Sequence, residues 1–271
     1  MTDASKFSVM VLSYNYKFDN INPSIRNEII ESLVDTKYTR FVALTEGKYD
    51  MVVWFYLVNL ETFINFYDKF LRNYRKYLAK QFLTGDIGVE FFSYDFLISD
   101  KPRKTLQIKS KKSDTKYIPL DKFDNQDILI LKELSKNPRI QIIEIAKKIG
   151  VSAITIKSRI QKLIDNWVIF GFSVVIDWSK IGYKYYTLEI ILYDYQQKNE
   201  ILKFLKTNPY LIKILKSYGH GVDIKCDIIQ HNIDYLRATI EDITNNFPNS
   251  IKNIDYFNTY KINKLDHLPP I

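Results

Sequence analysis

The sequence predicts an α+β protein in which two βαββαβ sandwich domains flank a three-helix domain of the winged helix-turn-helix type. Three observations predict this architecture. A helix-turn-helix pattern lies in the middle of the chain, a repeat of strands and helices lies on both sides of it, and a basic segment separates the first repeat from the middle. A chain of 271 residues with 46% hydrophobic residues is long enough to bury several cores.

The first repeat covers residues 1–98. Apolar runs rich in Val, Ile, Tyr and Phe indicate strands, and the i, i+3, i+4 spacing of Phe63, Phe66, Tyr67 and Phe70 indicates a helix. The predicted order is a strand at 7–16, a helix at 23–33, two strands within 39–58, a helix at 61–78 and a strand at 88–98.

The second repeat covers residues 181–271 and has the same order. The predicted segments are a strand at 185–195, a helix at 199–207, two strands within 211–230, a helix at 233–247 and a strand at 251–262. Leu60 follows Asp50 by ten positions, as Ile233 follows Asp223, so the two repeats agree in spacing. The βαββαβ order is that of a ferredoxin-like domain.

Positive charge is concentrated in the middle of the chain. Residues 99–119 hold seven basic and two acidic residues, and residues 120–180 hold ten and seven, within a net charge of +8 for the chain. We interpret 99–119 as a linker, because its composition is polar and it carries no periodic apolar pattern. The basic residues suit contact with nucleic-acid phosphates, and they would equally keep an exposed linker solvated.

Residues 120–180 carry the helix-turn-helix pattern. Gly150 lies between two apolar-periodic runs, and Ser152 stands where the N-cap of the second run is expected, as Asp124 does for the first helix. Ile156, Ile160 and Leu163 form one stripe, which predicts the buried face of the recognition helix.

The opposite face of this helix supplies the candidate DNA-binding residues. The N-terminal part of a recognition helix meets base edges, so Ala153, Ile154, Lys157 and Ser158 are the candidates for base readout. Gln161 and Lys162 are expected to contact the backbone, and Ser152 to cap the helix. For Arg159, a phosphate contact and an ion pair inside the module with Glu144 or Asp165 are both open. The full set is Ser152, Ala153, Ile154, Lys157, Ser158, Arg159, Gln161 and Lys162.

The module resembles the Lrp/AsnC family of transcription regulators. The resemblance is carried by Phe123–Leu131 in the first helix, Ile149–Ser152 in the turn, and Val168–Phe172 with Ile181–Tyr183 after the recognition helix. One departure is Trp167, where the family usually has Gly. The resemblance implies that residues 182–268 form the domain that serves dimerisation and amino-acid sensing in the family. Residues 1–98 resemble an additional copy of that domain.

The resemblance also implies an effector site at the turn between the second and third strands of each sensor-like domain. A Gly shortly before an Asp helps form the amino-acid pocket of the family, and His220 replaces one such Gly here. The alternative is that the glycines make the turn and the Asp residues cap it. The candidate residues are Gly47, Asp50, Gly219, His220, Gly221 and Asp223.

Double-stranded DNA is the expected partner, and the chain is expected to form a homodimer or a higher oligomer. Two recognition helices spaced by about one helical turn, roughly 34 Å, give such modules their specificity. Each predicted sheet has one face without helices, so the sheet domains are the natural interface. The sequence leaves two alternatives open: the two sheet domains of one chain pair with each other, or sheet domains of two chains pair.

Other functions have weaker support in the sequence. No phosphate loop, nucleophile motif, His/Cys metal spacing or long apolar segment occurs, so we expect no catalytic residue, no metal, no cofactor, no membrane partner and a cytoplasmic location. Cys226 is expected to be a core residue. The alternatives are an enzyme that resembles siroheme decarboxylases, which use His and Arg on a tetrapyrrole, and a non-specific architectural DNA-binding protein.

Overall fold

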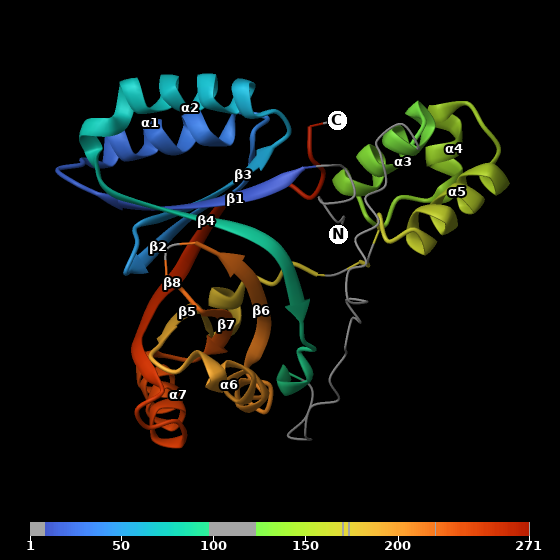
Figure 1. Cartoon of the computed structure of the whole chain (residues 1–271). Coiled ribbons are helices and arrows are strands. Elements are labelled where there is room, and N and C mark those ends of the chain that lie inside the picture. Colours follow the sequence, from blue (N-terminus) through green and yellow to red (C-terminus); the bar gives the residue numbers. More distant parts are fainter. Residues whose placement is uncertain (1–8, 98–122, 170, 173, 220, 271) are drawn as a thin grey trace.

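The computed structural model describes residues 9–97, 123–169, 171–172, 174–219 and 221–270. It consists of an eight-stranded barrel with helices on its outside and a three-helix module that stands beside the barrel (Figure 1). None of the helices in these residues is long and apolar enough to cross a membrane. The predicted linker at 99–119 lies outside the described residues.

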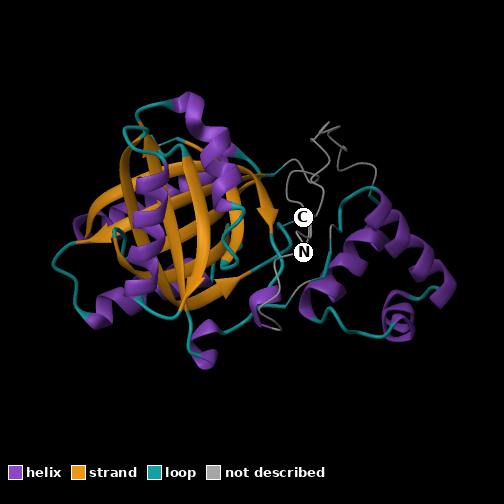
Figure 2. Ribbon diagram, turned by 90° about the horizontal axis from the view of Figure 1, so that it is seen from below, coloured by secondary structure: helices purple, strands orange, loops and turns teal. Residues whose placement is uncertain are grey.

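All eight strands belong to one closed barrel (Figure 2). Neighbouring strands are antiparallel, and their order around the barrel is β1-β3-β2-β8-β5-β7-β6-β4. The strands are β1 Met10–Phe18, β2 Thr39–Gly47, β3 Met51–Leu57, β4 Leu78–Phe91, β5 Lys184–Leu192, β6 Leu211–Tyr218, β7 Ile224–Gln230 and β8 Ile251–Leu265.

The barrel consists of two halves with the same βαββαβ order, which we call the N-terminal unit (β1 to β4) and the C-terminal unit (β5 to β8). Within each unit the last strand pairs with the first, the first with the third and the third with the second. The mixed α+β architecture that the sequence predicts is confirmed. The helices on the units are α1 Pro23–Val34, α2 Leu60–Tyr74, α6 Lys198–Leu205 and α7 Ile233–Asn246.

The two units join at two seams, the β2–β8 pair and the β4–β6 pair. At the first seam Gly47 is paired with Phe257, and at the second Gly219 approaches the carbonyl oxygen of Leu83. The φ angles of these two glycines are +110° and +107°, so the backbone has a similar conformation at the two positions. The units therefore pair within one chain, which is one of the two arrangements that the sequence leaves open.

The helices cover the outside of each unit and pack on alternate strand residues. In the N-terminal unit Phe63 and Phe70 of α2 pack on Val53 and Phe55 of β3, and in the C-terminal unit Ile201 and Ile243 belong to the equivalent cluster. The intervening strand residues point to the interior of the barrel, hereafter the lumen, because side chains alternate along a strand.

The prediction for the last strand of the N-terminal unit is wrong in position. A strand is expected at 88–98, but β4 begins at Leu78, and α2 ends at Tyr74 rather than at residue 78. Residues 78–86 pair with β1, and only residues 85–91 pair with β6 of the other unit. Gly85 and Gly88 interrupt the apolar pattern of this strand, so the sequence indicates only the part that forms the seam.

The helix-turn-helix module contains α3 Asn125–Lys136, α4 Ile142–Ile149 and α5 Ala153–Asp165. Ile130, Ile145, Ile156 and Leu163 are buried in its core. The same apolar cluster also includes residues at one edge of the barrel, so the module is packed on the barrel. These barrel residues are Val9, Val11, Tyr56 and Leu268.

Candidate nucleic-acid interface

The turn that positions the recognition helix has the geometry expected from its sequence. Gly150 ends α4 in the left-handed region with φ +80°, and its N–H donates to the carbonyl of Ala146 at 2.9 Å. Ser152 then starts α5, since its Oγ accepts the N–H of Thr155 at 3.1 Å. A glycine adopts this backbone without the steric cost of a side chain, and the serine satisfies a free helix N–H, so both predicted roles are confirmed.

The first helix of the module is capped by two aspartates. Asp124 Oδ1 accepts the N–H groups of Gln126 and Asp127 at 2.9 and 3.0 Å, and Asp127 completes a capping box with the N–H of Asp124. These backbone donors, first that of Asp127, lower the pKa of the Asp124 carboxyl. The predicted N-cap at Asp124 is therefore confirmed.

The buried and exposed faces of α5 follow the predicted stripe. Ile156 and Leu163 are fully buried and Ile160 is half-buried against the same core. On the opposite face Ile154 is 83% exposed, and Lys157, Ser158, Gln161 and Lys162 are exposed as well. Ile154 therefore offers an apolar side chain beside exposed polar and basic ones on the same face of the helix.

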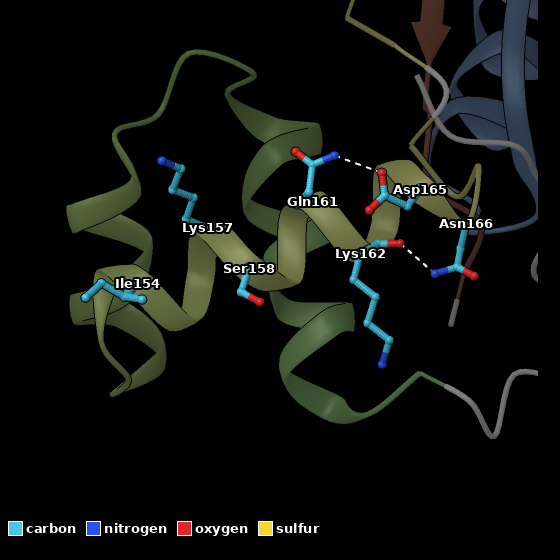
Figure 3. A pocket seen from close by; sticks show the side chains of 7 residues that line it. All are labelled: Ile154, Lys157, Ser158, Gln161, Lys162, Asp165 and Asn166. Atoms are coloured by element: carbon cyan, nitrogen blue, oxygen red, sulfur yellow. Dashed lines mark hydrogen bonds between the residues drawn. The ribbon is translucent and has the colours of Figure 1, made fainter.

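A hollow of about 500 Å³ runs along this exposed face of α5 (Figure 3). Ile154 and Lys157 lie at its N-terminal end, and the helix presents its side chains side by side toward solvent. The lining residues are Ile154, Lys157, Ser158, Gln161, Lys162, Asp165 and Asn166. The structure thus brings five of the eight predicted DNA-binding residues onto one open surface.

Three predicted residues lie elsewhere. Ala153 is half-buried against the core of the module, and Ser152 is used as the cap. Arg159 turns back onto α3, where its Nη1 lies 2.8 Å from both Asp124 Oδ2 and Asp127 Oδ1. Of the two alternatives for Arg159 the internal ion pair is correct, but its partners are Asp124 and Asp127 rather than Glu144 or Asp165. Asp127 is buried, so Arg159 supplies the countercharge that this carboxylate needs.

Asp165 and Asn166 are part of the hollow and were not among the predicted residues. Asp165 Oδ1 accepts from Gln161 Nε2 at 2.8 Å, and Asn166 Nδ2 donates to the carbonyl of Lys162 at 2.7 Å (Figure 3). The i, i+4 spacing of Gln161 and Asp165 is the sequence signal that could have indicated the first pair. Asp165 places a negative charge at the C-terminal end of the exposed face of α5. Its hydrogen bond directs the Gln161 amide toward the C-terminal end of the helix.

Residues 123–166 match the family described as winged helix-turn-helix DNA-binding. The HTH-type transcriptional regulator LrpB of Bacillus subtilis is 34% identical over 120 residues, which cover 44% of this chain and 80% of that protein. The HTH-type transcriptional regulator LrpA of B. subtilis is 33% identical over 99 residues, or 36% of this chain and 73% of that protein. The chain belongs to the Lrp/AsnC family of transcriptional regulators. Like these relatives, it is a regulator with a DNA-binding helix-turn-helix domain.

A likeness in fold extends over the whole chain. The crystal structure of the siroheme decarboxylase NirDL matches 99% of this chain and 77% of that chain with a TM-score of 0.62 and 9% identity. At this identity the likeness concerns the fold.

Trp167 departs from the glycine that is usual at this position in Lrp/AsnC proteins, and the structure shows what the departure involves. Trp167 has φ +60°, in the left-handed region, directly after α5, and its N–H donates to the carbonyl of Ile164 at 2.9 Å. A bulky residue in this region of the backbone costs on the order of 1–3 kcal/mol. The recognition face is unaffected, because Val168 and Ile169 still enter the core.

The two turns predicted as effector sites hold their aspartates in structural roles. Asp50 Oδ2 accepts the N–H of Phe18 at 2.8 Å, and Asp223 Oδ2 accepts the N–H of Leu192 at 2.7 Å. Asp50 is also paired with Lys17 Nζ at 2.7 Å. Gly47 and Gly219 lie at the seams and Gly221 has φ +69°, while His220 lies outside the described residues. A hollow of about 300 Å³ adjoins the first turn at Gly47.

Within the described residues, no group of three or more His, Cys, Asp or Glu side chains is placed to hold a metal ion. His231 is exposed and stacks on Tyr183, with ring centroids 4.1 Å apart. Burial lowers the pKa of His267 to about 4, so this imidazole is neutral near pH 7.

Proposed function

We propose that this regulator binds double-stranded DNA sequence-specifically by placing the N-terminal part of α5 in the major groove. The observation that carries the proposal is the exposed face of α5, where Ile154, Lys157 and Ser158 stand at the end of the helix that meets base edges. In the described part of the chain, Lys157 and Lys162 form no ion pair with an acidic side chain, so both ammonium groups are available for DNA.

The chemistry of the exposed face assigns a contact to each side chain. Ile154 suits van der Waals contact with a thymine methyl group, and Lys157 suits the acceptors of guanine or a phosphate. Ser158 suits a base edge, while Lys162 suits a phosphate, as it lies about one turn further along the helix. Gln161 contributes to backbone contact only if its amide leaves Asp165.

The experiment is selection of a binding site from random duplexes, followed by affinity measurements on that site at several salt concentrations. We expect Lys157→Ala and Ser158→Ala to weaken the selected site by about 1–3 kcal/mol each and to reduce discrimination between bases. Lys203→Ala is the matched control, because Lys203 is exposed on α6 of the C-terminal unit, outside the module. A non-specific architectural protein would instead select no site, and that outcome would refute the proposal.

For the domains, we propose ferredoxin-like units at 1–98 and 181–271, a basic linker at 99–119 and the helix-turn-helix domain at 120–180. We propose that the protein is cytoplasmic and binds DNA there.

The barrel already pairs the two sheets within the chain, so a second recognition helix has to come from a second copy of the protein, through another surface. Light scattering with and without the selected duplex tests this assembly. A homodimer on DNA supports it, and a 32.1 kDa protein that stays monomeric on DNA contradicts it.

An amino-acid effector site at the two turns stays a prediction, and the hollow that adjoins Gly47 and Lys48 favours the first turn as the one to test. Asp50 is engaged by Phe18 and Lys17, and Asp223 by Leu192, which favours the structural role of these residues. Calorimetric titration with each of the common amino acids tests the prediction. Binding that is lost in Gly47→Ala, in protein that circular dichroism shows to be folded, and kept in Gly221→Ala would support an effector site at this turn, and heats at the level of buffer for every amino acid would exclude it.

A further inference from the structure

The lumen of the barrel is lined by buried polar and charged side chains. A closed barrel of this size is usually filled by apolar side chains, and a buried polar group without a partner is costly. The buried polar and charged lumen residues on strands include Ser13, Asn15, Thr84, Thr187, Glu189, Lys225 and Asp227, and an apolar cluster with Ala43, Val52 and Phe257 fills the lumen beside them. Their hydrogen bonds divide them into a satisfied and an unsatisfied group.

The satisfied group surrounds Asp227, which is 2% exposed. Its carboxylate accepts from Thr187 Oγ1 at 2.6 Å, pairs with Lys213 Nζ at 2.7 Å, and accepts the hydroxyl of Tyr185. Burial raises the pKa of Tyr185 well above its usual value, so the phenol keeps the proton that it donates. This group is complete without a ligand.

Glu189 and Lys225 form the unsatisfied group on the wall of the C-terminal unit. Glu189 Oε2 accepts from Lys48 Nζ and from Tyr49 Oη, both at 2.8 Å. Glu189 Oε1 has no hydrogen bond, and its nearest ammonium, Lys225 Nζ, lies 3.8 Å away. Lys225 is 4% exposed, and its Nζ has no hydrogen-bond partner in the described structure.

The charges near Lys225 balance only through a carboxylate at the edge of the lumen. Lys48 and Lys225 contribute two ammonium groups, Glu189 contributes one buried carboxylate, and Asp255, 2.8 Å from Lys48 Nζ and 34% exposed, contributes the second. Both carboxylates contact Lys48, and the nearest one to Lys225 is Glu189 Oε1 at 3.8 Å, without a hydrogen bond. A buried ammonium without a hydrogen bond is costly, so an acceptor beside Lys225 would stabilise it.

The wall of the N-terminal unit offers further donors. Asn15 Nδ2, Trp54 Nε1 and Thr84 Oγ1 are buried and have no hydrogen-bond partner in the described structure. Ser13 is paired with Trp54 on one side and with Thr84 on the other, and Asn15 follows two residues later on the same face of β1. These atoms therefore share one patch of the lumen wall. The ring of Trp54 lies 5.3 Å from Lys213 Nζ of the other unit, so the two walls face each other.

We propose that the lumen is a binding site for a small organic acid, whose carboxylate binds Lys225 and whose other polar atoms accept hydrogen bonds from Asn15, Trp54 and Thr84. Each of these four groups is a donor, and an acid with oxygen acceptors satisfies them together. The site is separate from α5 and from the aspartates of the two turns. It therefore goes beyond the proposed DNA contact.

A route into the lumen lies at Lys48. The hollow of about 300 Å³ at the surface is lined by Gly47, Lys48, Ile254, Asp255 and Tyr256. Lys48 stands between this hollow and Glu189, since its ammonium contacts both Glu189 and the hollow-lining Asp255. Movement of this flexible side chain toward solvent opens the path to Lys225, while the backbone of the barrel stays in place.

The test uses the indole N–H signals of the full chain in a proton–nitrogen NMR spectrum. The chain has three tryptophans, and Trp54→Phe assigns the signal of the lumen. Acetate, succinate and inorganic phosphate are titrated at constant ionic strength. We expect succinate or acetate to shift the Trp54 signal with saturation and to leave the signals of Trp167 and Trp178 in place. Phosphate distinguishes an organic acid from an inorganic anion.

Two variants and one control decide the outcome. Lys225→Met should weaken the titration about tenfold or more, because it removes a charged hydrogen bond, and Thr84→Val should weaken it by a smaller factor. Lys203→Met on α6 should bind as the parent does. If Trp54 does not respond to any of the three probes, or responds equally in Lys225→Met, ordered water alone fills the lumen and the proposal is overturned. If phosphate binds and neither acid does, the proposed ligand class is wrong.

Discussion

The two units of the barrel share one hydrogen-bonded frame and differ in what they place inside it. Asp50 and Asp223 occupy equivalent turns, and each accepts the N–H at the end of the first strand of its unit. The N–H groups of the same two aspartates donate to the carbonyls of Tyr16 and Ile190 at 2.9 and 3.0 Å. The frame is therefore set by backbone bonds and turn residues, which the two units have in common.

The lumen residues at equivalent positions have different chemistry. Counted from the shared turn, Trp54 corresponds to Asp227 and Val52 to Lys225, and counted along the first strand, Asn15 corresponds to Glu189. In a symmetric dimer of identical chains every lumen substitution would occur twice. Here the two walls are separate segments of one sequence and can be substituted independently. One wall can therefore carry charged residues while the other carries neutral hydrogen-bond donors. Fusion of the two units thus permits an asymmetric interior inside a nearly symmetric barrel.

Among substitutions that test this difference between the two walls, Asp227→Ala is expected to have the largest effect on stability. The change removes the buried carboxylate that accepts from Tyr185 and Thr187 and pairs with Lys213, which should lower the free energy of unfolding by about 3–5 kcal/mol. Urea denaturation followed by circular dichroism measures the change. The equivalent position in the other unit provides the control: Trp54→Phe removes no buried charge and should cost less. Equal losses at the two positions would mean that the charge has no special role.

The second prediction concerns the two seams. A Cβ atom at Gly47 would lie 2.9 Å from the carbonyl oxygen of Tyr256, and one at Gly219 would lie 3.0 Å from that of Leu83, both at positive φ. We expect Gly47→Ala and Gly219→Ala each to cost about 1–3 kcal/mol of the free energy of unfolding. Gly88→Ala is the control, because its Cβ would meet only Lys216 side-chain atoms at 3.5 Å or more. A Gly219→Ala protein as stable as the parent would show that the seams are not equivalent.

The third prediction compares the turn aspartates. Asp50→Ala and Asp223→Ala each leave one strand N–H without its acceptor, at a cost of about 1–2 kcal/mol. Asp50→Ala also breaks the pair with Lys17, which is partly exposed and adds at most about 1 kcal/mol. Thermal unfolding at neutral pH measures both, and Lys17→Met isolates the contribution of the ion pair. A larger loss for Asp223→Ala would contradict the comparison.

The smallest effect is expected at Cys226, whose equivalent in the N-terminal unit is Val53. Both side chains are fully buried under the helices, so Cys226→Val should change stability by less than about 1.5 kcal/mol. Burial raises the pKa of the Cys226 thiol to about 12, because the thiolate is disfavoured away from water. The thiol should therefore stay unlabelled by maleimide at pH 8 in the native protein and react fully in denaturant. Rapid labelling of the native protein would mean that this core opens readily.

Much of the helix-turn-helix module could be predicted from the sequence because its signals are local. Gly150, Ser152 and Asp124 each act on backbone groups within a few residues, and the apolar spacing of α5 sets its buried face. The partners of Arg159 could not be predicted, because Asp124 and Asp127 lie on another helix, more than thirty residues earlier in the chain. That contact depends on how α3 and α5 pack.

The order of strands and helices in the two units could also be predicted, but not the closure of the barrel. The seams join residues such as Gly47 and Phe257, which are distant in the sequence and carry no periodic pattern that identifies the partner. The lumen was missed for the same reason. Alternation indicates that Glu189 and Lys225 share a face, but only the closed barrel shows that this face is buried.

Closure of the barrel has a consequence for self-association. Among the described residues each strand pairs with two neighbours over most of its length, so little strand edge is left on which another chain could add a strand. If either seam opens, two edges are exposed at once, and each matches the edge exposed on a second molecule in the same state. The seams are therefore the points at which two copies would exchange units, as in a domain-swapped dimer.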